Sequence, residues 1–144
     1  MIEFVTALAA AAAAPIQVDV ISLDERRTQS PDLQTYERLR VRVANAGGAP
    51  ATFRLCPEDL RSENIGLRDG RSSSAVRAFA ASVAPRRSWR AGCQNVPLEP
   101  GQSRVVTYFL RGENRDIRTQ RRELRLVTNA GAFTFRLPSR VRAT

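Results

Sequence analysis

The chain has 144 residues, of which 42% are hydrophobic and 26% are charged, a composition typical of one globular domain with a hydrophobic core. Its formal net charge is +9, all its basic side chains are arginine, and it has two cysteines and no histidine. Catalysis by Ser-His-Asp or Cys-His groups and zinc sites of the Cys/His type are therefore excluded. The carboxylates show no pair whose spacing indicates catalysis, so we expect a non-enzymatic protein without a metal or cofactor.

Residues 1–14 contain an apolar run that starts at Phe4 and ends in six alanines. The run is too short to span a bilayer as a helix, whereas its length and small residues fit a secretory signal peptide cut near Ala13. Glu3 stands where a basic residue is usual, and an alanine-rich N-terminal helix is the alternative. We interpret residues 1–14 as a signal peptide and residues 15–144 as a single domain, periplasmic or secreted.

Alternating apolar residues predict the first strands. Ile16, Val18 and Val20 alternate with polar neighbours, the period of a strand with one buried face. Residues 24–35 are polar and contain a Ser-Pro-Asp turn, which predicts a loop. Residues 38–56 then alternate on both sides of an Asn-Ala-Gly-Gly turn, and we interpret this stretch as a β-hairpin.

The same turn chemistry recurs near the C-terminus. Residues 124–137 again place Asn-Ala-Gly between two alternating segments, which predicts a second hairpin. An internal repeat is one explanation. Independent use of the same turn is the simpler one.

Residues 57–103, between the two hairpins, show a weaker pattern, and we expect a long surface excursion there. Residues 75–84 fit either a strand or a helix capped by Ser74, and the flanking β-patterns favour a strand. A Pro-Gly turn then leads into residues 104–110, whose β-branched and aromatic side chains predict a strand buried on both faces. About seven strands without a βαβ unit indicate an all-β antiparallel sandwich.

Two turn motifs resemble those of bacterial extracytoplasmic Ig-like modules, including the cell-adhesion-related type. They are Asn-Ala-Gly at residues 45–47 and Leu-Glu-Pro-Gly at residues 98–101. The resemblance covers roughly residues 36–110. It implies an Ig-like β-sandwich and, because it rests on turn chemistry, specifies the fold far better than the function.

Cys56 and Cys93 are the only cysteines. In an exported chain they most simply form one disulfide, which would close a loop of about 38 residues and anchor the irregular segment. Two reduced, buried thiols are the alternative if the protein is not exported.

Arginines are concentrated after the strand predicted at residues 104–110. If residues 113–123 were helical, three of these arginines would share one face and could bind phosphates or carboxylates of a polymer. A solvated segment that keeps the protein soluble is the alternative. The candidate anion-binding residues are Arg111, Arg115, Arg118, Arg121, Arg122 and Arg125.

These features favour an exported Ig-like domain that binds or scaffolds a protein or another component of the cell envelope through sheet edges or loops. The alternative is a basic module that binds an anionic polymer through residues 111–125: an envelope glycan, a lipid headgroup or nucleic acid. We do not expect nucleic acid for an exported chain with few aromatic residues and no groove-reading motif. We expect no transmembrane segment.

Overall fold

The computed structural model describes residues 15–27, 35–65, 76–84, 89–111 and 121–138. These residues form ten strands, all strand pairs are antiparallel, and no α-helix occurs among them. The predicted all-β antiparallel sandwich is confirmed, with more strands than expected. No described segment is a helix long and apolar enough to cross a membrane. The expected signal peptide lies outside the described residues.

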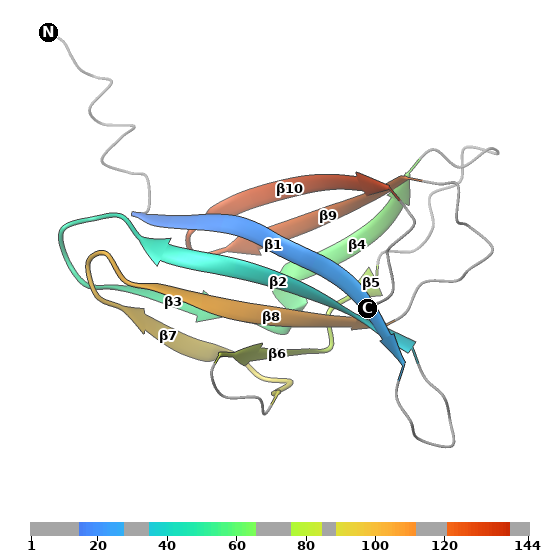
Figure 1. Cartoon of the computed structure of the whole chain (residues 1–144), viewed down its shortest axis with the longest axis horizontal. Helices are drawn as coiled ribbons and strands as arrows, with labels where there is room; N and C mark the ends of the chain where they lie inside the picture. The colour runs from blue at the N-terminus through green and yellow to red at the C-terminus, as the bar shows by residue number, and fades with distance from the viewer. Residues whose placement is uncertain (1–14, 28–34, 66–75, 85–88, 112–120, 139–144) are drawn as a thin grey trace, which may run out of the picture.

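The first layer is a four-stranded sheet in the order β1-β2-β8-β6 (Figure 1). In β2, Leu39, Val41 and Val43 are buried and the arginines between them face outward, as the period of two in the sequence predicts. The strands are β1 (Ile16–Arg27), β2 (Thr35–Asn45), β8 (Ser103–Arg111) and β6 (Ala80–Val83).

Strand β1 is longer than expected, because residues 24–27, predicted to lie in a loop, continue the pairing with β2. Asp24 is 8% exposed, and its carboxylate accepts two hydrogen bonds from the Arg38 guanidinium, at 2.9 and 2.8 Å. This bidentate ion pair satisfies a polar group within the sheet, so a polar stretch can still form a strand.

The second layer contains a four-stranded sheet in the order β10-β9-β4-β5 and a two-stranded sheet of β3 and β7. The Asn129 side chain joins the two: it accepts a hydrogen bond from the Arg54 N–H at 2.9 Å and donates one to the Thr52 carbonyl at 2.8 Å. The elements are β3 (Ala51–Leu55), the 3₁₀ turn η1 (Pro57–Asp59), β4 (Leu60–Ile65), β5 (Val76–Arg77), β7 (Gln94–Leu98), β9 (Arg121–Thr128) and β10 (Gly131–Pro138).

The core lies between the layers and draws on all three sheets. Burying each large apolar side chain contributes about 1.5–3 kcal/mol of transfer free energy. The described strands therefore stabilise one another through one shared core. Its fully buried side chains include Leu39, Val41, Phe53, Leu55, Leu98, Tyr108, Leu110, Leu124 and Leu126.

Of the two predicted hairpins, the one at residues 38–56 is wrong and the one at residues 124–137 is confirmed. Strand β2 pairs with β1 and β8, whereas β3 pairs with β7, so the first Asn-Ala-Gly turn carries the chain from one layer to the other. The Asn45 side chain, 1% exposed, holds this crossing by donating a hydrogen bond to the Leu98 carbonyl at 3.0 Å. Strands β9 and β10 pair directly across the second turn.

The surface excursion expected over residues 57–103 is not found in its described part, which contributes β4, β5, β6 and β7 to the sheets. The strand interpretation of residues 75–84 is confirmed for the described residues, which form β5 and β6. The strand at residues 104–110 is buried on one face only, because an outer face of a two-layer sandwich has no second layer to cover it. Its residues Val105, Thr107 and Phe109 are half-buried on that outer face.

Tyr108 is a polar side chain placed wholly within the core. It is 0% exposed, and its hydroxyl has no hydrogen-bond partner among the described residues. Burial, with a smaller contribution from the Asp59 charge, raises the pKa of Tyr108 well above its ordinary value of 10.0. The hydroxyl therefore costs stability and stays protonated in the folded protein at alkaline pH.

We expect Tyr108→Phe to be neutral or to stabilise the protein by up to about 1 kcal/mol at pH 7, because it removes an unsatisfied buried hydroxyl. Above pH 10 the unfolded state of the wild type loses the tyrosine proton and the folded state keeps it. Wild-type stability should therefore fall there by about 1.4 kcal/mol per pH unit more than that of the variant. Urea unfolding between pH 7 and 11 measures both effects. Destabilisation of the variant at pH 7 would contradict this account. The control is Tyr36→Phe, which removes the same hydroxyl from a tyrosine outside the core.

Candidate functional site

The outer face of the β1-β2-β8-β6 sheet carries arginines and aromatic residues side by side. On β2, Tyr36 and Arg38 share the outward phase, because the alternate residues face the core. The register with β8 places Phe109 directly opposite Arg38 and Arg111 directly opposite Tyr36. Cross-strand neighbours on one face of a sheet lie within contact distance of each other. Two apolar rings and two guanidinium groups are therefore adjacent on a surface that faces solvent.

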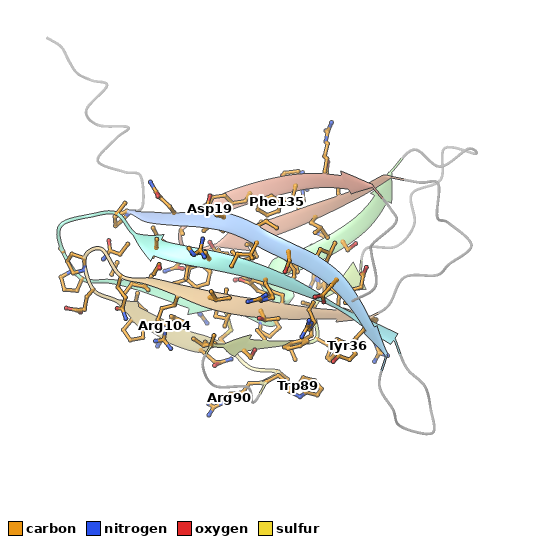
Figure 2. All side chains as sticks on the ribbon, viewed as in Figure 1. Asp19, Tyr36, Trp89, Arg90, Arg104 and Phe135 are labelled. Carbon is orange, nitrogen blue, oxygen red and sulfur yellow. A yellow bond between two sulfur atoms is a disulfide. The ribbon has the colours of Figure 1, made fainter. Side chains whose placement is uncertain are left out.

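Four aromatic rings form one cluster on this face. Trp89 contacts Phe79 edge-on, with ring centroids 5.4 Å apart, and contacts Phe109 at 5.8 Å. Phe109 also contacts Phe79 at 6.5 Å and Tyr36 at 6.0 Å. Trp89 is 58% exposed and the other three rings are half-buried. Figure 2 shows Trp89 beyond β6, the edge strand, and Tyr36 at the start of β2, an inner strand. We call this surface the aromatic-arginine face. It consists of Tyr36, Phe79, Trp89, Phe109, Arg38, Arg40, Arg42 and Arg111.

The backbone beside Trp89 is fixed to the sheet. Arg90 and Ala81 exchange two backbone hydrogen bonds of 2.9 Å, and the Gln94 side chain donates a third to the Ala81 carbonyl at 3.2 Å. Cys93, four residues after Trp89, is disulfide-bonded to Cys56. The segment that carries the exposed ring is thus attached at several points, which restricts where the ring can point.

The arginines of this face outnumber the carboxylates beside them on β1, where Asp24 lies opposite Arg38 and Asp19 lies opposite Arg42. Asp24 is engaged by Arg38, and this hydrogen bond, the largest cause, raises the pKa of Arg38. Arg40 and Arg111 are exposed, and the ion pairs between described residues involve neither of them. Exposed guanidinium groups without an internal partner remain available for carboxylates or phosphates of a ligand.

This face was not predicted from the sequence, although a signal was present. Tyr36 shares its strand phase with Arg38, and Phe109 shares its phase with Thr107 and Arg111, so both rings occur where polar side chains are usual. An aromatic residue in the outward phase of a strand indicates a contact outside the core. The convergence with Phe79 and Trp89 depends on strand pairing.

The predicted arginine-rich cluster is divided between two sheets. Arg111 ends β8 in the first layer, whereas Arg125 lies on β9 in the second, where its Nε is 3.8 Å from Glu123. Residues 121–123 begin β9, so the helix considered for residues 113–123 is wrong at this end. Strand pairing with β4 and β10 requires this extended conformation. The side chains of Arg121 and Arg122 are not described, and Arg115 and Arg118 lie outside the described residues.

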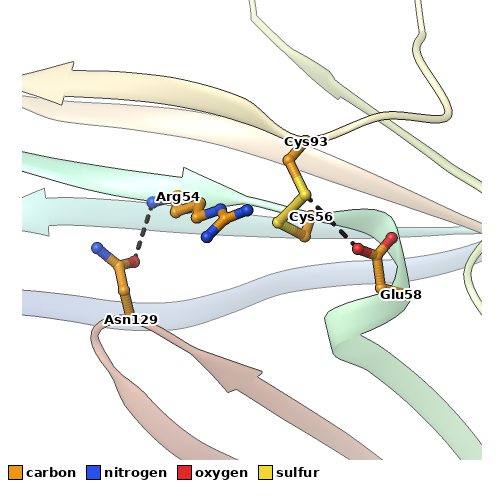
Figure 3. The surroundings of a disulfide bond; sticks show 5 residues. All are labelled: Arg54, Cys56, Glu58, Cys93 and Asn129. Carbon is orange, nitrogen blue, oxygen red and sulfur yellow. Dashed lines mark hydrogen bonds between the residues drawn. A yellow bond between two sulfur atoms is a disulfide. The ribbon is translucent and has the colours of Figure 1, made fainter.

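The predicted disulfide between Cys56 and Cys93 is confirmed and joins the end of β3 to the start of β7 (Figure 3). Glu58 Oε1 lies 3.5 Å from Cys93 Sγ. A disulfide sulfur carries no hydrogen, so this contact becomes a hydrogen bond only if the bridge is reduced to thiols. Cys56, Glu58 and Cys93 also place three potential metal-ligand atoms within 4.8 Å. Because metal ligation by cysteine requires thiolates, the oxidised pair does not supply them.

Comparisons with known proteins identify the fold. No protein-family model matches the chain, and no curated protein matches it. Among solved structures, an uncharacterized β-sandwich protein from Clostridium difficile 630 is similar, with a TM-score of 0.51 over 86% of each chain and 5% sequence identity. This similarity shows the fold alone: the chain is a β-sandwich.

Proposed function

We propose that this protein is an exported, non-enzymatic β-sandwich domain that binds a component of the bacterial cell envelope through its aromatic-arginine face. The observation that carries the proposal is the exposed ring of Trp89, supported by Phe79 and Phe109 and flanked by arginines. Large exposed aromatic side chains and arginines are the residues most enriched at binding hot spots.

The chemistry of this face favours binding over catalysis. A guanidinium remains protonated at all physiological pH values, so arginine cannot act as a general base. The Asp24 carboxylate is engaged by Arg38. Aromatic rings and arginines provide stacking, hydrogen bonds and charge, which are means of recognition.

Export is supported by two independent features. Disulfides persist mainly in oxidising compartments, and Cys56 is joined to Cys93. Residues 1–14 have the apolar run and the small residues of a signal peptide. Both features agree with an envelope partner, because the periplasm and the cell surface are where an exported domain meets one.

The test begins with the full-length chain expressed in a bacterium. We expect the periplasmic fraction to contain a form cut near Ala13 whose mass rises by two hydrogens on reduction. This form should sediment with purified cell envelopes, and Trp89→Ala should lower the retained amount about tenfold, because the ring is the central apolar contact.

The matched control is Val127→Ala. Val127 is 56% exposed on β9, in the second layer, so this substitution truncates a similarly exposed apolar side chain outside the aromatic-arginine face. The control should be retained like the wild type. An uncut, cytoplasmic chain would overturn the export half of the proposal. Equal retention of the Trp89 variant, or no retention of the wild type, would overturn the binding half.

A further inference from the structure

We propose that the ligand of the aromatic-arginine face is an acidic polysaccharide whose sugar rings carry carboxylates. The inference rests on the proposed function, since it names the chemistry of the component that this face binds. Such a polymer has two kinds of group. Its C–H ring faces match an aromatic side chain, and its carboxylates match guanidinium groups.

Trp89 provides the apolar contact. Its side chain is 58% exposed, yet it is supported by Phe79 at 5.4 Å and by Phe109 at 5.8 Å. A supported ring loses little conformational entropy when a ligand stacks on it, which lowers the cost of binding. The C–H groups of a sugar ring can pack against such a ring while the hydroxyl groups at its rim stay hydrated.

The arginines provide the charge. Arg38 already holds the Asp24 carboxylate by two hydrogen bonds, the geometry in which a guanidinium recognises a carboxylate. Arg40 is the next outward residue on β2, and Arg111 lies opposite Tyr36 at the aromatic cluster. Successive outward positions on a strand are about 6.8 Å apart. Because arginine side chains are long and flexible, neighbouring guanidinium groups at this interval can reach separate carboxylates of one polymer chain.

Single-stranded nucleic acid fits this face less well. Proteins that bind it stack successive bases on several exposed aromatic side chains. Among the four rings of this cluster only Trp89 is exposed, and the half-buried rings of Tyr36, Phe79 and Phe109 are tilted by 45° to 54° in their mutual contacts. The disulfide also favours an oxidising compartment over the cytosol and the nucleus.

The test is a titration of the mature protein with polygalacturonate, followed by the fluorescence of Trp89, the only tryptophan in the chain. We expect saturable binding that changes this fluorescence and weakens steeply as salt is added. The methyl ester of the same polymer has the same rings without the charges, and its affinity should be about tenfold lower. Calorimetry, which needs no tryptophan, should show a similar loss for Trp89→Ala.

Two double variants separate local recognition from net charge. Arg40→Gln/Arg111→Gln removes two exposed arginines from the aromatic-arginine face and should weaken binding about tenfold with a smaller salt dependence. Arg125→Gln/Arg136→Gln removes two arginines that pair with Glu123 in the second layer, and it should bind like the wild type. Thermal melting establishes that each variant is folded.

Several results would overturn the inference: equal affinity for polygalacturonate and its methyl ester, equal affinity for a single-stranded oligothymidine, equal losses in the two double variants, or no binding of polygalacturonate. These failures are distinguishable from failure of the proposed function. Retention on cell envelopes that depends on Trp89, without binding of polygalacturonate, overturns this inference and leaves the proposed function standing.

Discussion

The variant Cys56→Ala/Cys93→Ala is expected to lose about 4 kcal/mol of unfolding free energy relative to the oxidised wild type. The two cysteines are 37 residues apart in sequence, and a bridge over such a loop strongly restricts the unfolded chain. In the folded protein the bridge joins the end of β3 to the start of β7. Urea unfolding under non-reducing conditions measures the difference in free energy.

The matched control for this prediction is the wild type in the presence of a reductant. Reduction opens the same loop without changing the sequence, so its unfolding free energy should fall close to that of the double variant. A double variant that unfolds within about 1 kcal/mol of the oxidised wild type would show that the bridge does not stabilise the fold by restricting the unfolded state.

Asn45→Ala is expected to lower the free energy of unfolding by about 3 kcal/mol. The Asn45 side chain donates hydrogen bonds to the carbonyls of Ala49, at 2.8 Å, and Leu98, at 3.0 Å, and accepts one from the Gly47 N–H at 2.9 Å. Truncation leaves these groups without their partner, and the Leu98 carbonyl is in a buried contact. Chemical denaturation measures the loss.

Asn129→Ala is the matched control, because Asn129 begins the same Asn-Ala-Gly sequence and its side chain also bonds to backbone groups. Asn129 is exposed, so water can replace its contacts with Thr52 and Arg54, and the expected loss is about 0.5–1 kcal/mol. Similar losses in the two variants would show that burial of Asn45 is not what makes it important.

The outcome for the two Asn-Ala-Gly turns shows which parts of the fold were predictable. Residues 124–137 form a hairpin because β9 and β10 are adjacent both in sequence and in the sheet. Residues 38–56 contain equally clear strand signals, yet both edges of β2 are occupied by β1 and β8. Turn chemistry is local, whereas one edge of β2 is occupied by β8, whose residues are more than fifty positions away from their partners.

Single features of the candidate site were predictable from the sequence, whereas their arrangement was not. The outward phase of Arg38 and Arg40 follows from the buried residues beside them, and the pairing of Cys56 with Cys93 was predicted correctly from the cysteine count and the expected export. The cluster expected at residues 111–125 is divided, because β8 and β9 belong to different sheets.

The sequence by itself determined the all-β class and the buried and exposed phases of strands such as β2, and it favoured the disulfide that the structure shows. Side-chain alternation is a local property of an extended chain, so it can be recognised without knowing the fold. Only the tertiary structure decided which strands pair, and with that the meeting of Tyr36, Phe79, Trp89 and Phe109 on one face. The physical reason is that strand pairing is selected by the burial of a shared core, to which segments far apart in sequence contribute together.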